Sequence, residues 1–372
     1  MINLFKVFIP PMVIEPLSRT LFSGYVGQGP RVEEFEQKLK PWLGTDYILS
    51  TITGTAAIHM ALRLAGVGPG ASVITTPMTC MATNLPIVNE GAKIIWADIN
   101  PRTGLIDPND VEILVNLYDA QAIVCVDWGG TPADLDDLFE IGSNYGIPVI
   151  EDACQAFGAE YNGHKVGGVS DFSCISFQAI KTISTVEGGC LTVKTPDDYS
   201  AGKLLRWYGI DREQPRRDFR CEQNVDLRGD KWNLSDVNAV IGIEALKYAE
   251  TLLAGQGERA EYYLREFEVR GIKRAKPIEY AKGKKSAFWL FTILVDNRDE
   301  FIEYMTSRGI ATSRVHERND IHSCFQEFQR GELPGVDEFV AHEVNIPVHY
   351  GITKPDLEYI MDCIQKFDSE KP

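Results

Sequence analysis

Short apolar runs separated by amphipathic stretches organise the first two thirds of the chain. Apolar residues recur at helical spacing in 31–40 and 55–65. Other runs, four or five residues long, are typical of buried strands, and they lie at 47–50, 72–75, 93–96, 122–126 and 147–150. Strands that alternate with helices predict a mainly parallel α/β sheet with helices on both faces. Such sheets bind ligands at the carboxyl ends of their strands, where Thr53, Asp127 and Asp152 fall.

The pattern changes after about residue 235. Longer amphipathic helices are expected there, with one strand among them, in the order 236–253, 258–270, strand 289–295, 298–308 and a closing helix from Lys354. This arrangement is typical of a smaller α+β domain. We therefore expect a large α/β domain over 1–235 and a small C-terminal domain over 236–372.

Composition limits the possible partners. The chain has 372 residues, of which 44% are hydrophobic and 24% charged, and this predicts a soluble globular protein. The net charge of −16 argues against nucleic acid or an anionic membrane as a partner, and no apolar run is long enough for a membrane span. Eight scattered cysteines without a CxxC pair favour a reduced, cytoplasmic location and no metal site.

One loop lysine stands out because of its neighbours in sequence. A strand-like run ends at Ser176-Phe177, and the loop that follows presents Lys181. A single loop lysine is usually a solvated surface charge. Upstream, however, Glu151 and Asp152 end an apolar strand, where a buried carboxylate needs a positive partner. Asp152 could instead cap a helix, but the protonated ring nitrogen of pyridoxal 5'-phosphate (PLP) is a partner of the required charge.

Several motifs resemble, in order and spacing, those of the DegT/StrS-type nucleotide-sugar aminotransferases. They cover nearly the whole chain and lie at 25–30, 54–57, 151–156, 176–181, 187–189, 230–239 and 346–351. The resemblance implies a fold-type-I PLP-dependent transferase that works as a homodimer with sites at the interface. It also implies an amino-acid donor, expected to be L-glutamate, a nucleotide-linked keto-deoxysugar acceptor aminated at C4 or C3, and pyridoxamine 5'-phosphate as the intermediate form of the cofactor.

The same resemblance assigns roles around the cofactor ring. Lys181 would hold PLP as a Schiff base and move the proton between substrate and cofactor. Asp152 would pair with the ring nitrogen, and Gln155 would hydrogen-bond the phenolic oxygen.

Four further residues would hold the cofactor phosphate. Thr55 and Ala56 would offer backbone N–H groups at a helix N-terminus, and Ser176 would add a hydroxyl. Asn233 would reach the phosphate of the neighbouring subunit, although an Asn before a helix also serves as a cap.

A polar cluster at 314–322 is a candidate for substrate contacts. Arg314, His316 and His322 would bind the sugar or its diphosphate, and the alternative is a solvated loop. Trp289 is expected to be a packing residue. The chain departs from the family at Cys80, where many relatives carry an aromatic residue that stacks on the cofactor, and at Asp127, where they usually carry His.

Other functions stay open at this point. Relatives that dehydrate sugars with pyridoxamine phosphate lack the lysine, so Lys181 argues against that reaction. A non-nucleotide keto-sugar or a small phosphorylated ketone could replace the expected acceptor. A non-catalytic PLP-binding regulator is disfavoured because the sequence has no helix-turn-helix segment, no basic stripe and a net charge of −16.

Overall fold

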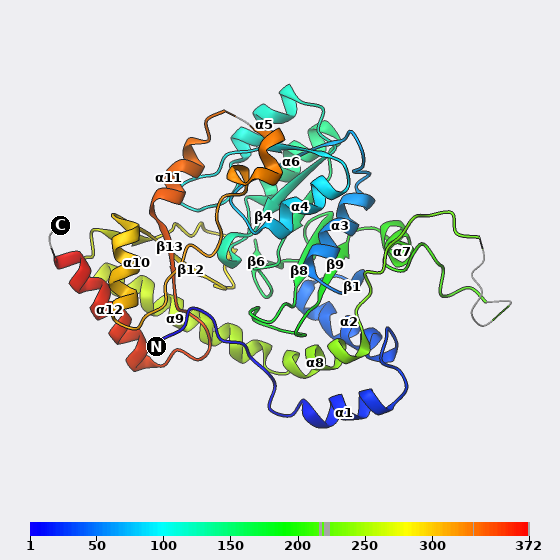
Figure 1. The fold of residues 1–372 in the computed structure, drawn as a ribbon, viewed down its shortest axis with the longest axis horizontal. Helices are drawn as coiled ribbons and strands as arrows, with labels where there is room; N and C mark the ends of the chain where they lie inside the picture. The colour runs from blue at the N-terminus through cyan, green and yellow to red at the C-terminus, as the bar shows by residue number, and fades with distance from the viewer. Residues whose placement is uncertain (216–217, 219–223, 330, 371–372) are drawn as a thin grey trace.

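The expected strands of the first part of the chain form one sheet (Figure 1). The computed structural model describes residues 1–215, 218, 224–329 and 331–370, and in this part of the chain the large sheet has seven strands in the order β1-β9-β8-β5-β4-β2-β3. Neighbours pair in parallel except at β9, which is antiparallel to both β1 and β8. The predicted mainly parallel sheet is therefore confirmed. The strands are β1 Ile48–Thr51, β2 Ser72–Thr75, β3 Lys93–Trp96, β4 Ala122–Val126, β5 Val149–Asp152, β8 Phe172–Ser176 and β9 Gly189–Val193.

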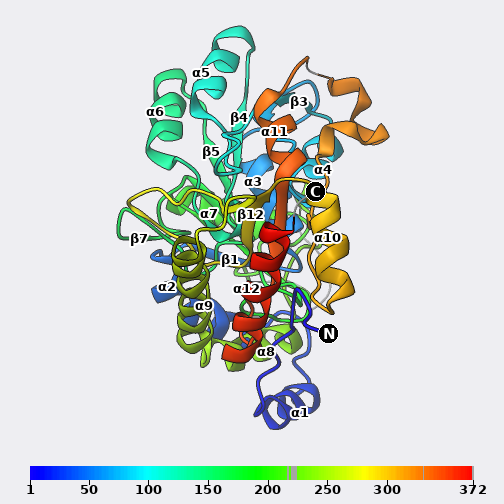
Figure 2. The same ribbon diagram turned by 90° about the vertical axis from the view of Figure 1, so that its left-hand side faces the viewer.

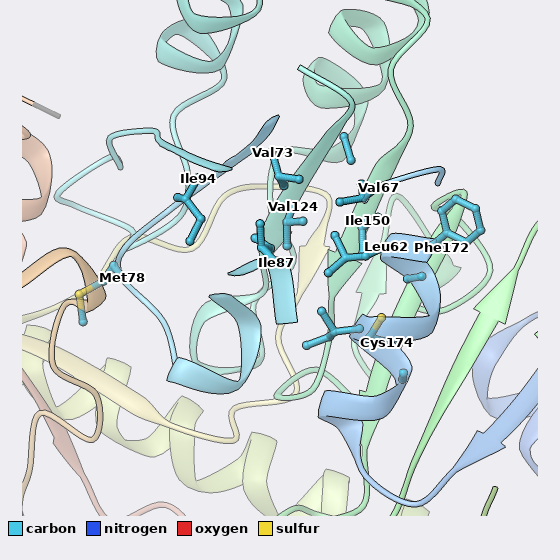
Figure 3. Packing of buried hydrophobic residues seen from close by; sticks show 14 of the residues in the cluster. Leu62, Val67, Val73, Met78, Ile87, Ile94, Val124, Ile150, Phe172 and Cys174 are labelled. Atoms are coloured by element: carbon cyan, nitrogen blue, oxygen red, sulfur yellow. The ribbon is translucent and has the colours of Figure 1, made fainter. Parts of the chain in front are cut away.

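Both faces of this sheet are buried because successive strand residues point to opposite sides and are apolar. On one face, Val73 and Val124 pack with Leu62 of α3 and Ile87 of α4, as Figure 3 shows. On the other face, Ile74 belongs to a separate apolar cluster under α5 and α6. Figure 2 shows the two layers of helices on either side of the strands. The helices of this part are α1 Ile14–Phe22, α2 Pro30–Leu43, α3 Gly54–Leu64, α4 Met81–Asn89, α5 Pro108–Leu117, α6 Leu135–Tyr145 and α7 Pro196–Leu205.

The C-terminal part builds its own core around a small antiparallel sheet in the order β10-β12-β13. Tyr263, Phe291 and Ile360 are fully buried in this core. Its elements are α9 Ala249–Arg270, β10 Ala275–Pro277, β12 Phe291–Val295, α10 Arg298–Ser307, α11 Pro334–His342, β13 Glu343–Ile346 and α12 Lys354–Ser369. The short strands β6 Glu160–Tyr161, β7 His164–Lys165 and β11 Lys284–Lys285 form a third sheet that joins the two parts.

Two sequence-based boundaries in this region were wrong. The long helix expected over 236–253 ends as α8 at Asp236–Leu246, and α9 continues through Gly255 and Gly257, where a break was expected. Glycine costs about 1 kcal/mol in a helix interior, and burial of Leu252 and Tyr263 on the same helix offsets that cost. Helix α8 packs on α2 beside the large sheet, although the predicted small domain begins at residue 236. The division of the chain at residue 235 therefore stays a prediction.

The described part of the chain contains no disulfide among its seven cysteines. The eighth, Cys221, lies outside the described residues. Within the same described residues, no helix combines the length and apolar character that crossing a bilayer requires.

Candidate active site

The carboxyl ends of β4, β5 and β8 bring the predicted acidic and basic residues to one edge of the large sheet. Val126 at the end of β4 lies opposite Asp152, and Asp152 lies opposite Cys174 of β8. The loop after β8 carries Lys181 close enough to Asp152 for their charges to interact. The structure therefore brings these two predicted residues together, as the topology of a parallel sheet requires.

Asp152 is a buried carboxylate held by two hydrogen bonds. It is only 5% exposed. Its Oδ2 accepts the hydroxyl hydrogen of Thr83 at 2.5 Å, and its Oδ1 accepts the backbone N–H of Cys154 at 3.1 Å. The Thr83 hydroxyl also lies 2.7 Å from that of Thr79. These donors fix the direction of the carboxyl group.

Lys181 lies against an aromatic ring that comes from the other part of the chain. Its Nζ is 3.6 Å from the ring centroid of Trp289, a distance typical of a cation–π contact. The Trp289 Nε1–H donates to the carbonyl oxygen of Ile180 at 3.0 Å, so the ring is fixed to the loop that carries the lysine. Burial lowers the pKa of Lys181, and the charge of Asp152 partly opposes that shift.

The N-terminal segment closes one side of this site. A small pocket lined by Phe5, Trp289 and Tyr350 lies between it and Lys181. Phe5 stacks on Trp289 with ring centroids 5.3 Å apart, and the Tyr350 hydroxyl donates to the carbonyl oxygen of Val7. Residues near both ends of the chain thus support the ring that contacts the lysine.

The turn between β1 and α3 provides the N-terminal end of a helix beside Ser176. Thr53 caps α3, because its Oγ1 accepts the N–H of Ala56 at 3.0 Å. The N–H of Ala56, one of the two predicted phosphate donors, is therefore bonded to the cap. The other predicted donor, the N–H of Thr55, also lies in the first turn of the helix. Gly54 makes the approach possible: a Cβ there would lie 3.0 Å from the Cβ of Ser176 and 2.8 Å from the Sγ of Cys154.

Gln155 and His316 meet across the site. The Oε1 of Gln155 accepts the N–H of Gly129 at 2.8 Å, and its Nε2 lies 3.5 Å from the Nε2 of His316. Burial, followed by the positive charge of Lys181, lowers the pKa of His316 to about 4. The imidazole is therefore uncharged at neutral pH.

Asn233 lies beside the β1–α3 turn of its own chain. It forms a β-bridge with Thr51, and the preceding carbonyl of Trp232 accepts the N–H of Ile52 at 2.6 Å. The side chain is buried, and its Oδ1 receives no hydrogen bond from the described residues. An unpartnered buried carbonyl oxygen so close to this turn is compatible with a role in ligand binding.

The other predicted substrate residues are less directly placed. Arg314 pairs with Glu317 through both terminal nitrogens, so its charge is already neutralised. His322 follows a short 3-10 turn, and its N–H donates to Asn319, outside the group of residues around Lys181. Of the three predicted substrate residues, His316 is the one that contacts this group among the described residues.

Three residues near the site were not predicted. Trp289 was expected only to pack, yet it contacts the lysine. Thr83 holds Asp152, and Asn319 anchors the loop of His316 by bonding Asn84 and the carbonyl oxygen of Thr79. The sequence around Thr83 offered one clue: it lies in the first turn of a helix that begins just after a strand end.

The family model described as "DegT/DnrJ/EryC1/StrS aminotransferase family" matches residues 12–365. The chain belongs to this family. It is therefore a PLP-dependent aminotransferase of the kind that acts on sugars, as the motifs predicted, and the fold-type-I architecture is confirmed by the structural neighbours described next.

Relatives cover almost the entire chain. The UDP-4-amino-4,6-dideoxy-N-acetyl-beta-L-altrosamine transaminase of Campylobacter jejuni is 31% identical over 94% of this chain and 93% of its own. The spore coat polysaccharide biosynthesis protein SpsC of Bacillus subtilis is 28% identical over 95% and 93%. Among solved structures, the sugar aminotransferase CalS13 of Micromonospora echinospora has a TM-score of 0.93 and 34% identity over 98% of this chain and 100% of its own. AtS13 of Actinomadura melliaura has the same TM-score and identity, over 98% of both chains.

Proposed function

We propose that this chain transfers the amino group of L-glutamate to a nucleotide-linked keto-deoxysugar, with PLP held by Lys181. The observation that carries the proposal is the position of the Lys181 amine close enough to the buried carboxylate of Asp152 for their charges to interact. When bound, the cofactor supplies an aldehyde that exchanges the amino group and a ring that accepts electrons. Among the described residues, this 5% exposed carboxylate accepts hydrogen bonds from the uncharged donors Thr83 and Cys154, so it suits a protonated ring nitrogen.

The other predicted residues would bind the phosphate and the phenolic oxygen of the cofactor. The N–H of Thr55 and the hydroxyl of Ser176 would bind the phosphate, with the dipole of α3 favouring the anion. Ala56 would join them if its N–H left the side chain of Thr53. Gln155 would donate its amide to the phenolic oxygen, since its carbonyl oxygen is already used by Gly129.

Lys181 would also move the proton between the substrate carbon and the cofactor. An ordinary lysine is almost entirely charged at neutral pH and is a poor base. Burial lowers the pKa of Lys181 and so raises its neutral fraction. The Trp289 ring would hold the amine near the site when it is not bonded to the cofactor.

The donor and acceptor are proposals that the family supports. The Campylobacter jejuni relative is named for a UDP-linked 4-amino sugar, which favours a nucleotide-linked acceptor and amination at C4 over C3. His316 would offer an uncharged hydrogen-bonding group to the sugar. Arg314 would bind a diphosphate only after leaving Glu317, and His322 would bind from the edge of the site.

We also propose a cytoplasmic homodimer. Helix α1 lies at the edge of the molecule in Figure 1 and packs on α8 through Val13 and Leu17. Its other side leaves Ile14 and Phe22 exposed, at 72% and 89%. A second copy that covered this apolar face would bring the two sites to the interface. There the side-chain amide N–H of Asn233, which donates to the carbonyl oxygen of Leu234 at 3.1 Å in the single chain, would turn to the phosphate bound by the partner.

The absorbance spectrum tests the cofactor and the donor together. Purified protein is expected to show a band near the visible edge that moves to the pyridoxamine form when glutamate is added. A spectrum that stays featureless after incubation with PLP would contradict the proposal. The acceptor is tested by comparing a nucleotide-linked keto-sugar with the same free sugar; equal rates would remove the nucleotide from the proposal.

Lys181→Ala tests the central residue. Turnover should be abolished while circular dichroism and the unfolding midpoint stay close to those of the wild type. Lys194→Ala, at an exposed lysine that pairs with Asp171 at the surface, is the matched control and should keep full activity. Full activity in Lys181→Ala would rule out the mechanism.

A further inference from the structure

Two buried carboxyl groups lie directly behind the proposed ring-nitrogen partner. Asp127 follows β4, and Glu151 is the penultimate residue of β5; both are completely buried. Cys125 lies opposite Glu151 in the parallel pair, and the N–H of Asp127 donates to the carbonyl oxygen of Asp152 at 3.1 Å. Two adjacent carboxylates that were both ionised would repel strongly in such a dry environment.

The hydrogen bonds of this pair are incomplete in a specific way. Glu151 Oε2 accepts the hydroxyl hydrogens of Ser170 and Ser173 at 2.8 and 2.5 Å, and Asp127 Oδ1 accepts the N–H of Ala133 at 3.0 Å. Asp127 Oδ2 and Glu151 Oε1 receive no hydrogen from any donor of the described residues. Glu151 lies opposite Cys125, and Asp127 is two residues beyond Cys125, so both carboxyl groups project from the same face of the sheet and interact with each other. One proton between these two oxygens would give both of them a hydrogen-bond partner.

We propose that Asp127 carries this proton on Oδ2 and donates it to Glu151 Oε1, and that this neutral acid positions the turn that holds Gln155 and Trp289. The charge belongs on Glu151 because two serine hydroxyls already stabilise it there, whereas Asp127 has one backbone donor. In agreement, burial first and the charge of Glu151 second raise the pKa of Asp127 well above its ordinary value. The other titratable groups that interact with the pair are Asp152 and Cys125.

The turn after Asp127 connects Gln155, near Asp152, with the segment that carries Trp289. Gly129 donates its N–H to Gln155 Oε1 at 2.8 Å, and its carbonyl oxygen accepts the N–H of Leu290 at 3.0 Å. Gly130 has φ 97° and accepts the N–H of Ala287 at 2.9 Å. A Cβ at Gly130 would lie 2.8 Å from the carbonyl oxygen of Gln155, so the turn packs directly against the backbone of Gln155. Asp127 thereby fixes the positions of Gln155 and of the backbone on both sides of Trp289.

The shared proton is tested by Asp127→Asn in the full-length protein. The amide can donate to Glu151 and accept from Ala133, so it reproduces the neutral acid without a titrating group. In the infrared spectrum at neutral pH, the carbonyl band of a protonated carboxylic acid should lose intensity relative to the wild type. Glu343 is also buried with a raised pKa and gives a band of its own, so the measurement is the difference between the two proteins. An unchanged band would overturn the proposal.

The pH dependence of unfolding gives an independent test, because it does not require activity. A folded pKa above the unfolded value near 3.8 stabilises the protein fully below that value, and the stabilisation is lost as pH rises through the folded pKa. Wild-type stability should therefore fall with rising pH, by at most about tenfold per pH unit in the unfolding constant, and Asp127→Asn should reduce this slope. Equal slopes in the two proteins would contradict the shared proton.

A control and a second variant keep the test decisive. Asp236 is also fully buried, but its carboxylate accepts the N–H groups of Gly29, Arg31 and Val32. Asp236→Asn should lower the unfolding midpoint at every pH, because an amide has only one acceptor oxygen. If Asp127→Asn does not fold, Glu151→Gln should remove the same infrared intensity, since the glutamine amide would donate to an ionised Asp127.

The positioning role rests on the proposed function and has its own measurement. Asp127→Ala should shift the absorption maximum of the bound cofactor as Gln155→Ala does, whereas Asp127→Asn should leave the maximum in place. A shift in Gln155→Ala but not in Asp127→Ala would leave the shared proton intact and refute the positioning role. Failure of the protein to bind PLP would refute the proposed function alone.

Discussion

The two walls of the active site differ in how the chain builds them. The large sheet contributes Asp152 and Lys181 from the ends of adjacent strands, and these residues carry the charges that the proposed chemistry needs. The opposite wall contributes Trp289 and His316 from segments more than a hundred residues later. Its contacts with the first wall are hydrogen bonds and one ring face. The large sheet thus positions the catalytic groups of the first wall, which we call the charged wall. The opposite wall, which we call the recognition wall, depends on contacts between distant segments.

The walls also differ in charge. On the second wall, the pKa of His316 lies near 4, so the ring is uncharged at neutral pH. The guanidinium groups of Arg314 and Arg318 are paired with Glu317 and Asp320. This wall therefore offers neutral or neutralised groups, and a sugar that binds there would be recognised by hydrogen bonds and shape.

The largest effect is expected from neutralising the charged wall. Asp152→Asn keeps the shape of the side chain but removes the negative charge that would hold the ring nitrogen in its protonated form. We expect kcat to fall by on the order of 100- to 1,000-fold, the size measured when one fixed electrostatic group is removed. Steady-state rates with saturating donor and acceptor measure this loss.

Asp171→Asn is the matched control for Asp152→Asn. Asp171 is a partly exposed carboxylate just before β8 that pairs with Lys194 at the surface. It should keep nearly full activity. Comparable losses in both variants would show that general electrostatics, and not the position of Asp152, accounts for the result.

A smaller effect is expected from the ring that joins the walls. Trp289→Leu removes the aromatic face 3.6 Å from Lys181 Nζ together with the hydrogen bond to Ile180. A partly desolvated cation–π contact contributes roughly 1 to 2 kcal/mol, so kcat should fall by about tenfold. Trp289→Phe keeps a ring and should lie between leucine and the wild type. Tyr304→Leu, which removes a ring beside Arg308 on α10, is the control and should leave kcat unchanged. Identical rates for the Phe and Leu variants would argue that the ring only fills space.

The difference between residues positioned by strand ends and residues positioned by distant contacts explains what the sequence could predict. The strand ends, the acidic pair at Asp152 and the loop lysine at 181 follow from local patterns, because a parallel sheet gathers the ends of its strands whatever surrounds them. Trp289 could not be assigned this way. It lies in an apolar stretch that resembles a strand, yet the chain at Phe288 has φ 49°, and the strand begins only at Phe291.

Buried polar contacts were equally hidden from the sequence. Asp127 departs from the family pattern at the sequence level, but the sequence does not indicate that it lies beside Glu151, which accepts from two serine hydroxyls. The helix break at 247–248 was missed for a related reason. Gly255 and Gly257 are strong local breakers, and packing of α9 on the small sheet outweighs them.

The smallest effect should come from loosening the recognition wall without touching the charged one. The amide of Asn319 is buried, donates to the carbonyl oxygen of Thr79 at 2.8 Å and accepts from Asn84 at 3.0 Å, which docks the loop of His316 on the start of α4. Asn319→Ala removes these bonds. Each is worth about 1 kcal/mol net, so the KM for the acceptor should rise by about tenfold or less while kcat stays close to the wild-type value.

The distinction between KM and kcat decides whether the two walls are separable. The exposed Cys324 lies further along the same segment, and Cys324→Ser should change neither constant. If Asn319→Ala lowers kcat as much as it raises the KM for the acceptor, the loop of His316 must also position the groups around Lys181. The contact of 3.5 Å between His316 and Gln155 would then be the route, because it is a direct side-chain contact from that loop to a residue of the charged wall. An effect on KM alone would instead mean that the sheet maintains its catalytic geometry independently of how the acceptor is held.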